Sequence, residues 1–492
     1  MSTTARYDLL IRRGTVVDGT KAPRFDADVG VRGSRIAAVG DLAGASATRT
    51  LDAAGLIVAP GFIDSHTHDD QALLAQPDMP FKVSQGVTTV IAGNCGISAA
   101  PLRRGMKLPM PLDLLDGPDS ERHESFASWV AALQARPAAT NVAALVGHST
   151  LRAVTMGEDD LDREARGDEV EAMQALLADA LDAGAIGLST GTFYPPAVKA
   201  STDEIVAVGR PLSTRGGLYV THMRDEGSRV MEALDETFRI GRALGVTVVV
   251  SHHKVQNRPN FGRSVETLAF IRETMTRQPV CLDCYPYTAG STMIRTDRGM
   301  LDGRILIASS VPHPECAGRE LGDIVASWGV AESEAARRMQ PGTAIYFLMD
   351  EPDVQRILAF DETMIGSDGI PVGEKPHPRL WGTFPRVLGH YSREVGLFPL
   401  ETAVWKMTGL TARNFGVADR GTVGVGKHAD LVLFDAAAIR DAATYEAPTT
   451  PAEGIHAVIV NGGVAWEGGH STGLRSGQVL KRTTPGPNGA AA

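Results

Sequence analysis

The sequence predicts an α/β fold: a (β/α)8 barrel, a small β-sandwich domain formed by the two chain ends, and an inserted lid. Short apolar runs alternate with amphipathic segments eight times along the middle of the chain, as in a barrel of parallel strands. Both chain ends instead carry short apolar stretches broken by Gly and Asp, which is typical of strands joined by tight turns. The 492 residues suffice for one large and one small domain.

The two chain ends are expected to form the small domain together. Residues 1–60 contain strand-like stretches such as YDLLIRRGTVVDG, and residues 415–482 show the same texture in GTVGVGKHADLVLFD and GIHAVIVNGGVAWEGG. The barrel is assigned to residues 61–414, between these two segments. Residues 483–492 are rich in Pro, Gly and Ala, which predicts a flexible tail.

Eight apolar runs are assigned as barrel strands because each ends in polar residues suited to chemistry. The runs are GLIVAPGFIDSHTH, GVTTVIAGNCG, NVAALVGHST, AIGLSTG, GLYVTHMRDEG, VTVVVSHHK, VCLDCYPYTAG and TMIGSDG. Helical patterns such as SRVMEALDETFRIGRALG lie between several of them, and Ser228 and Gly245 are the expected caps of that helix. A doubly wound sheet is the alternative fold, but no Gly-rich phosphate loop follows the first strand.

The segment at about residues 286–360 is too long for an ordinary loop between a strand and a helix. It contains helical pieces, RELGDIVASWG and SEAARRM. Long insertions at the catalytic face of a barrel usually act as lids or specificity elements, so we expect this one to be a lid.

Charge and composition narrow the class of partner to a small molecule. The net charge is −10 and no run of Lys and Arg stands out, so nucleic acid is not an expected partner. No apolar stretch reaches the roughly 18 residues of a membrane span, so no membrane association is expected. Four cysteines do not make a disulfide framework and no signal peptide is recognisable, which predicts a cytoplasmic protein. The oligomeric state cannot be read from the sequence.

Histidines and an aspartate end several of the predicted strands. His66 and His68 form an HxH, and side chains at i and i+2 on a strand share one face. Alone, this pair reads equally well as two satisfied polar residues. His222, His252 and Asp368 end three further strands at the same rim, where barrel active sites assemble. Together these five residues predict a metal centre.

Cys95, in AGNCG, ends the second predicted strand at the same rim. A thiolate and imidazoles both suit zinc, although a lone cysteine is more often a small buried hydrophobe. Its position at the rim favours the ligand interpretation. Cys281 and Cys284 are three residues apart on one strand and face opposite sides, so a shared redox or zinc role is not expected.

Polar neighbours of the strand-end histidines offer further candidates. His252 and His253 are adjacent, so only one can point inward; if His252 does, Lys254 does as well. A lysine there can hold a substrate carboxylate or carbonyl. Arg224 and Glu226 follow His222 by two and four residues, so their side chains are expected on the same face as that histidine. A functional role at the site and an ion pair between them that fixes the loop are equally good interpretations.

The motifs resemble those of a known family. VAPGFIDSHTHDD and GKHADLVLFD resemble the amidohydrolase superfamily. AGNCG, GHSTLR, GLSTGTFYPPA, THMRDEG, SHHK, DCYPYTAGST and GSDG together resemble the N-acyl-D-amino-acid deacylases, or D-aminoacylases, of that superfamily. The resemblance runs from about residue 7 to residue 479, and Cys95 replaces the carboxylated lysine of hydantoinase-like relatives.

The resemblance implies a role for each matching residue. A tightly bound zinc would be held by Cys95, His222 and His252. A second, weaker metal position would be framed by His66, His68 and Asp368 with the same cysteine. The substrate's carboxylate and carbonyl would be gripped by Lys254, Tyr285, Ser291 and Arg379. The pocket for the substrate's side chain would be lined by Met300, Tyr346 and Met349. Ordinary packing inside the lid is the competing role for these three residues.

The implied activity is zinc-dependent hydrolysis of the amide bond of N-acyl-D-amino acids, with Asp368 as the acid and base. Apolar side chains such as D-Met, D-Leu and D-Phe are expected, and the preference for D over L rests on the resemblance alone. Arg295 and Arg298 keep an N-acyl-D-glutamate or N-acyl-D-aspartate deacylase open. A cyclic amidase or dipeptidase would use a lysine on strand four, where AIGLSTG has none. A non-catalytic scaffold would show gaps among the ligands.

Overall fold

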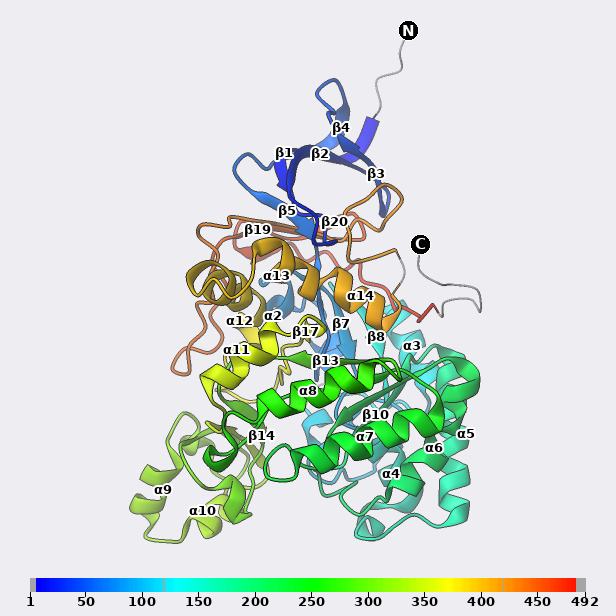
Figure 1. Ribbon diagram of the computed structural model, residues 1–492, viewed down its shortest axis with the longest axis vertical. Coiled ribbons are helices and arrows are strands. Elements are labelled where there is room, and N and C mark those ends of the chain that lie inside the picture. Colours follow the sequence, from blue (N-terminus) through cyan, green and yellow to red (C-terminus); the bar gives the residue numbers. More distant parts are fainter. Residues whose placement is uncertain (1–5, 118–119, 418, 484–492) are drawn as a thin grey trace.

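The computed structural model describes residues 6–117, 120–417 and 419–483. A curled sheet carries the N-terminal strands at the top of Figure 1, and a larger barrel with its insertion lies below it. Residues 484–492, which make up all but the first residue of the predicted tail, lie outside the described residues. No helix in the described ranges is long and apolar enough to cross a membrane.

Parallel strands form the barrel, and each predicted run contains one of its strands except the third, NVAALVGHST, which contains both β8 and β9. The hydrogen-bonded order is β6-β7-β8 in one sheet and β9-β10-β11-β12-β13-β17 in the other. The amide of Ile186, just before β10, donates to Ala144 of β8, and that of Ser65, just after β6, donates to Ile365 of β17, which joins the two sheets at both edges and closes the ring. The strands are β6 (Phe62–Asp64), β7 (Val87–Ala92), β8 (Asn141–Ala144), β9 (Val146–Gly147), β10 (Gly187–Gly191), β11 (Leu218–His222), β12 (Val248–Val250), β13 (Val280–Cys284) and β17 (Thr363–Ile365).

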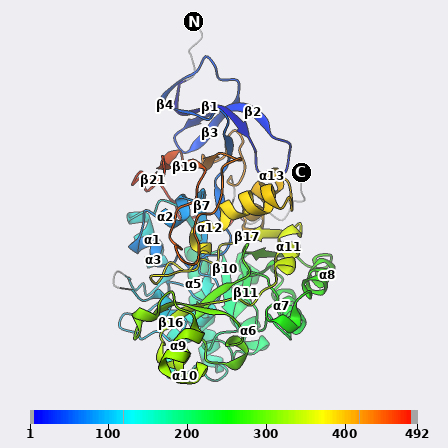
Figure 2. The same ribbon diagram turned by 90° about the vertical axis from the view of Figure 1, so that its left-hand side faces the viewer.

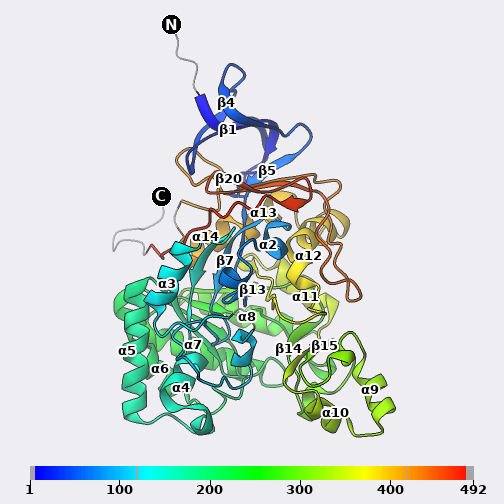
Figure 3. The same cartoon turned by 180° about the vertical axis from the view of Figure 1, so that it is seen from behind.

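Helices cover the outside of the barrel, as Figures 1 and 3 show for α5 to α8. Strands covered on one face by helices and on the other by the barrel interior read as continuous apolar runs, and these strands are buried throughout. The helices before the insertion are α1 (Ala72–Ala75), α2 (Pro80–Val83), η1 (Leu112–Leu115), α3 (Phe126–Ala135), α4 (His148–Met156), η2 (Glu158–Asp160), α5 (Gly167–Ala183), α6 (Thr202–Arg215), α7 (Val230–Leu244), η3 (Arg258–Asn260) and α8 (Ser264–Met275).

One of the two predicted caps of α7 is confirmed and the other is wrong. Gly245 ends the helix in a left-handed conformation, with φ of 65°. Ser228 does not cap it, because the helix begins at Val230 after Arg229 and has no side-chain cap. The carboxylate of Asp225 accepts the amides of Gly227 and Arg229 instead, so this local turn orders the chain before the helix.

The insertion contains the two helices that the sequence predicts. It also contains an antiparallel three-stranded sheet that was not predicted. It lies at the far end of the molecule from the small sheet (Figure 2). Its sheet order is β14-β16-β15. Its elements are β14 (Gly290–Met293), η4 (Arg298–Met300), β15 (Ile305–Ser310), η5 (Pro314–Cys316), α9 (Leu321–Trp328), α10 (Glu332–Arg338) and β16 (Gly342–Tyr346).

After the insertion the chain returns to the barrel wall, where α11 packs beside α8 and β17. Helices then lead back toward the small sheet. These elements are α11 (Glu351–Ala359), α12 (Arg379–Arg386), the π-helix η6 (Val387–Glu394), α13 (Leu400–Met407) and α14 (Gly409–Phe415).

The small sheet joins both ends of the chain. β5 pairs antiparallel with β18, so strands from the two ends share one continuous sheet. The first predicted run is divided: β5 belongs to this sheet and β6 to the barrel. The sheet curls around its own apolar core. Its strands are β1 (Arg6–Val16), β2 (Phe25–Arg32), β3 (Arg35–Gly40), β4 (Ser46–Asp52), β5 (Ile57–Pro60), β18 (Leu431–Phe434), β19 (Ile455–Val460), β20 (Gly463–Glu467) and β21 (His470–Ser471).

Strand register aligns the polar strand ends at one rim. Gly191 at the end of β10 lies opposite His222 at the end of β11. An isolated bridge pairs Thr67 with Gly369, which brings the HxH segment against the GSDG segment. The predicted candidates that follow the strands therefore meet at one end of the barrel.

Candidate metal centre

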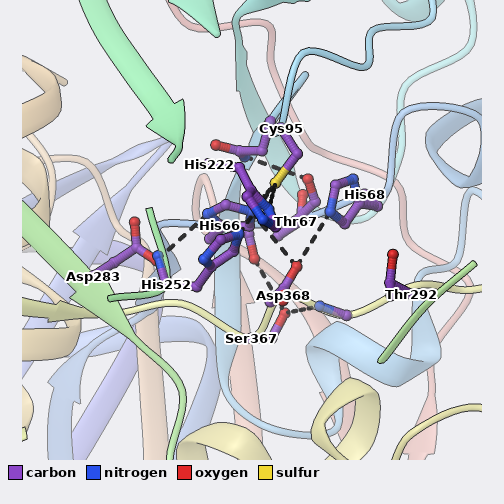
Figure 4. A network of polar contacts seen from close by, with 12 residues as sticks. His66, Thr67, His68, Cys95, His222, His252, Asp283, Thr292, Ser367 and Asp368 are labelled. Atoms are coloured by element: carbon purple, nitrogen blue, oxygen red, sulfur yellow. Dashed lines mark hydrogen bonds and ion pairs between the residues drawn. The ribbon is translucent and has the colours of Figure 1, made fainter. Parts of the chain in front are cut away.

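Four of the predicted metal ligands surround the thiol of Cys95 at the barrel rim (Figure 4). Its Sγ lies 3.3 Å from Nε2 of His66, 3.3 Å from Nε2 of His252 and 3.7 Å from Nδ1 of His222. Donor atoms of His66, Cys95, His252 and Asp368 all lie within 4.8 Å of one another. The rim thus brings sulfur, nitrogen and oxygen donors into one buried site.

Asp368 connects this group to the sixth predicted ligand and to a buried cation. One carboxylate oxygen lies 3.2 Å from Nε2 of His68 and 3.6 Å from Nε2 of His66. The other lies 2.9 Å from Nη1 of Arg379, which is 1% exposed. The carboxylate therefore sits between imidazoles on one side and a guanidinium on the other.

Left-handed backbone conformations hold three of these side chains in place. Cys95, His252 and Asp368 have φ of 54°, 34° and 49°. Such values are unfavourable for residues with a Cβ and persist only where the surroundings enforce them, which is common at functional sites. At Gly366, a Cβ would lie 2.6 Å from the Cβ of His66, so the close approach of the GSDG segment requires glycine there.

The charge states of the thiol and the carboxylate follow from their neighbours. Burial raises the pKa of Cys95, but the facing imidazoles of His66 and His252 lower it further, and the net pKa lies well below that of a free thiol. Burial likewise raises the pKa of Asp368, and the Arg379 guanidinium with the surrounding histidines lowers it well below its usual range. The neighbouring cations and imidazoles therefore favour the anionic form of both groups.

This donor set fits a metal ion. Imidazole lone pairs that converge on a thiolate need a cation or protons between them, and the combination of thiolate and imidazole suits zinc. Nε2 of His222 and Nδ1 of His68 are buried and have no hydrogen-bond partner among the described residues. His253, the neighbour of His252, instead points away and contacts the Thr267 hydroxyl at 2.9 Å.

The predicted substrate residues lie beside the metal donors, in a pocket under the insertion with about 30 Å³ of free space. Arg379 does not line this pocket but lies behind it, donating from Nη2 to the Ser291 carbonyl oxygen at 3.0 Å. Its guanidinium carbon lies 4.6 Å from the centre of the Tyr285 ring. The other predicted residues that line the pocket are Lys254, Tyr285, Ser291, Met300, Tyr346 and Met349.

Comparison with known proteins gives the family. A family model described as "Amidohydrolase family" matches residues 49–278 and 330–465, which is more than half of the chain. The chain belongs to the amidohydrolase family. A D-aminoacylase from Alcaligenes xylosoxydans xylosoxydans is 59% identical over 477 residues, covering 97% of this amidohydrolase and 98% of the relative.

Two solved structures share the fold of this amidohydrolase over almost its whole length. A D-aminoacylase crystal structure has 61% identity and a TM-score of 0.95, covering 97% of this chain and 100% of its own. An N-acyl-D-glutamate deacylase from Bordetella bronchiseptica, complexed with zinc and a phosphonate inhibitor, has 45% identity and a TM-score of 0.93, with the same coverage. The predicted fold class is thereby confirmed.

The structure of this amidohydrolase decides between the two roles that the sequence left open for Glu226. Glu226 does not pair with Arg224, which instead bonds Glu236 and two loop carbonyls. One oxygen of Glu226 accepts from Nζ of Lys254 at 2.7 Å and lies 3.1 Å from Nδ1 of His252. Carboxylates in this position fix the orientation of metal-binding imidazoles.

Asp283 supports the site from β13 and was missed by the sequence analysis. Its Oδ1 accepts the amide of His252 at 2.8 Å and lies 3.4 Å from Nδ1 of His66. A single carboxylate inside an otherwise apolar, buried strand was the signal that could have revealed it, because a buried charge requires partners.

Lys82 is a second supporting residue that sequence reasoning missed. Its fully buried Nζ donates to Asp64 at 2.7 Å and to the Ser367 hydroxyl at 2.9 Å, and it lies 3.3 Å from Asp69. Asp64 in turn accepts the amide of Ser367 at 2.7 Å. Lys82 therefore ties the segment that carries the HxH to the segment that carries Asp368.

Proposed function

We propose that this amidohydrolase hydrolyses the amide bond of N-acyl-D-amino acids, giving a carboxylate and the free D-amino acid, with one tightly bound zinc ion. The observation that carries the proposal is the buried convergence of Cys95, His222 and His252 beside the ion pair of Asp368 and Arg379. A D-aminoacylase with 59% identity supports the substrate class.

The tight zinc position is assigned to Cys95, His222 and His252. A second, weaker position is assigned to His66, His68 and Asp368 with the shared thiolate, because Nε2 of His66 lies 3.3 Å from Sγ of Cys95 and Asp368 contacts both histidines. When bound, zinc lowers the pKa of a coordinated water to about 7 and so supplies a nucleophile at neutral pH.

Asp368 is the proposed acid and base. Arg379 keeps its carboxylate ionised, so it can accept a proton from the attacking water. The amine must leave protonated, and the carboxyl group formed in the first step is the adjacent proton source. His68, 3.2 Å away, holds the carboxylate in position for both transfers.

Tyr285 and two cations are assigned to the rest of the substrate's polar groups. The hydroxyl of Tyr285 is buried with no hydrogen-bond partner among the described residues, so it is free to donate to the oxygen that becomes negative during attack. Lys254 and Arg379 lie against the Tyr285 ring and Ser291 lines the same pocket as Tyr285; these three residues are assigned to the substrate carboxylate. A fixed fork of donors suits a carboxylate.

Apolar D-side chains such as those of D-Met, D-Leu and D-Phe are the proposed specificity. Met300, Tyr346 and Met349 supply apolar walls, and the Tyr346 hydroxyl is occupied because it donates to the Met293 carbonyl oxygen. An acidic side chain would need an available cation.

An N-acyl-D-glutamate or N-acyl-D-aspartate deacylase is the second candidate. The Arg295 guanidinium lies 4.5 Å from the ring centre of Phe193, which lines the pocket. Asp297 accepts from Nε of Arg295 at 2.7 Å, whereas Nη1 of Arg295 is buried without a hydrogen-bond partner among the described residues, and this donor is what keeps the acidic specificity as the second candidate. The side chain of Arg298 lies outside the described part of the chain.

We also infer a reducing compartment, the cytoplasm, as the place of action. A metal-binding Cys95 must remain a thiolate, and all four cysteines are free in the structure.

The test is release of free amine from N-acetyl-D-methionine, N-acetyl-L-methionine and N-acetyl-D-glutamate, with and without chelator and added zinc. The expected result is turnover of N-acetyl-D-methionine only, which is lost with chelator and restored by added zinc. Preferential turnover of the glutamate derivative would establish the second candidate. No turnover of any of them by zinc-loaded protein would contradict the proposal.

A further inference from the structure

We propose that the acyl chain of the substrate extends past His68 into a second pocket, and that this pocket lets the enzyme accept linear aliphatic acyl groups much longer than acetyl. The inference rests on the proposed amide hydrolysis and names the other half of its substrate. We call this space the acyl pocket. Its apolar walls are Ala72, Ala75, Leu114, Leu115, Pro371 and Val372.

Three separate segments build the acyl pocket at the same end of the barrel as the metal donors. Helix α1 follows the HxH directly, η1 belongs to the long loop after β7, and Pro371 follows shortly after Asp368 in the loop after β17. Ala72 and Leu115 are buried, whereas Ala75, Leu114 and Val372 are half-buried, as expected for walls that face an open space. The space measures about 280 Å³.

His68 connects the acyl pocket to the proposed reaction centre. Its ring lines the acyl pocket, and its Nε2 lies 3.2 Å from the carboxylate of Asp368. Asp368 itself lines the pocket under the insertion, which also holds Lys254 and Met300. The two spaces therefore lie on either side of the contact between His68 and Asp368.

Amide geometry directs the acyl chain toward this second space. A trans amide places its two flanking carbon atoms on opposite sides of the C–N bond. If the amino-acid half lies against Lys254 and Met300, the acyl half must leave in the other direction, past His68. The pocket under the insertion is much the smaller of the two, about 30 Å³ against about 280 Å³, so the longer chain is assigned to the space beyond His68.

The lining selects the chemistry of the chain. Six of the lining residues are apolar, and the polar ones are His68, Gln71, Gln76, Asp116 and Ser120, of which Gln76 and Asp116 are exposed and Asp116 is paired with Arg122. An unbranched hydrocarbon chain matches the apolar walls. A methylene takes about the space of a water molecule, roughly 30 Å³, so a chain of six to eight carbons fits.

The experiment compares kcat/KM for N-acetyl-, N-hexanoyl- and N-octanoyl-D-methionine. The zinc-loaded wild-type enzyme is expected to use both long substrates at least as well as the acetyl compound. Each methylene buried is worth roughly a fourfold change. Ala75→Trp and, in the loop after β17, Val372→Trp are each expected to lower the hexanoyl-to-acetyl ratio of kcat/KM by about tenfold or more.

A matched control is Val395→Trp, which places the same ring at a side chain that is 41% exposed and lines neither pocket. Its ratio should equal that of wild type. Wild-type enzyme that hydrolyses the acetyl compound but rejects both long chains would overturn the inference, as would Trp variants that keep the wild-type ratio. Failure on N-acetyl-D-methionine itself is a different outcome, because it contradicts the proposed function instead.

Discussion

Replacing Asp368 by Asn tests the proton-transfer step most directly. Asn has almost the same shape as Asp and keeps an oxygen that can accept from His68, but it cannot take up a proton. The backbone favours this choice as well. Asp368 has φ of 49°, a conformation that Asn adopts readily and that strains Ala by roughly 1–2 kcal/mol. Asp368→Asn therefore removes the chemistry with the least disturbance of the loop.

The expected loss follows from the role assigned to the carboxylate. A positioned acid or base contributes roughly 10²–10⁴-fold to the rate, which corresponds to about 3–5 kcal/mol of barrier. The substitution also removes the charge 2.9 Å from Nη1 of Arg379. Leaving that guanidinium unpaired in a buried site costs about 3–5 kcal/mol of unfolding free energy. The variant should therefore be nearly inactive and less stable, yet folded.

Initial rates on N-acetyl-D-methionine, with zinc content measured on the same sample, give the answer. The variant should keep one zinc per chain, since the tight position is assigned to Cys95, His222 and His252. Asp361→Asn is the control, because it neutralises an exposed carboxylate seven residues earlier. A zinc-loaded Asp368→Asn enzyme with kcat within tenfold of wild type would refute the assigned role.

Three further substitutions test the metal, the supporting network and a buried pair. Cys95→Ser should lose zinc on dialysis and with it activity, whereas His253→Gln, whose ring faces Thr267, should keep its metal; equal zinc content in both would contradict the ligand assignment. Lys82→Met leaves Asp64 and Asp69 without their cation, so urea denaturation should show that the free energy of unfolding falls by about 3–5 kcal/mol. An unchanged free energy of unfolding would show that Lys82 does not tie the two segments together. Glu204 is buried, which raises its pKa, but His148 and Arg152 lower it to about 2. Because the folded pKa is the lower one, this carboxylate stabilises the fold above its unfolded value near 4.5 and loses that effect as the pH falls toward about 2. Glu204→Gln should therefore lower Tm clearly at pH 7 and by less than half as much at pH 3, where the folded carboxylate is still mostly ionised; an equal loss at both would count against the pair.

The barrel strands were predictable because burial on both faces leaves a continuous apolar signal. The sheet of the insertion was not. Its first strand, Gly290–Met293, reads GSTM and is mostly half-buried, so no apolar run marks it. Its partner, Gly342–Tyr346, lies about fifty residues later, and no local pattern specifies such a pairing. Strand pairing depends on packing and cross-strand contacts that a single sequence does not reveal.

The same contrast separates the metal donors from the residues behind them. His66, Cys95 and Asp368 could be grouped because each follows a predicted strand, and parallel strands end at one rim. Lys82 has no such marker. It follows a Pro-Phe pair on a four-residue helix, and its hydroxyl partner, Ser367, is 285 residues away in sequence. A lone lysine in this context reads as a surface residue until its partners are known.

Charge balance explains why the supporting residues are found where they are. Three of the buried carboxylates at the rim each have a cation from another element against them: Lys82 beside Asp64, Lys254 beside Glu226, and Arg379 beside Asp368. An unpaired buried charge would cost several kcal/mol, so each pair must form as the strand ends come together. The pairs thereby fix the loops that carry the imidazoles and the thiolate. The residues with chemical roles thus lie at the strand ends, while the geometry of the site depends on contacts between segments that are far apart in sequence.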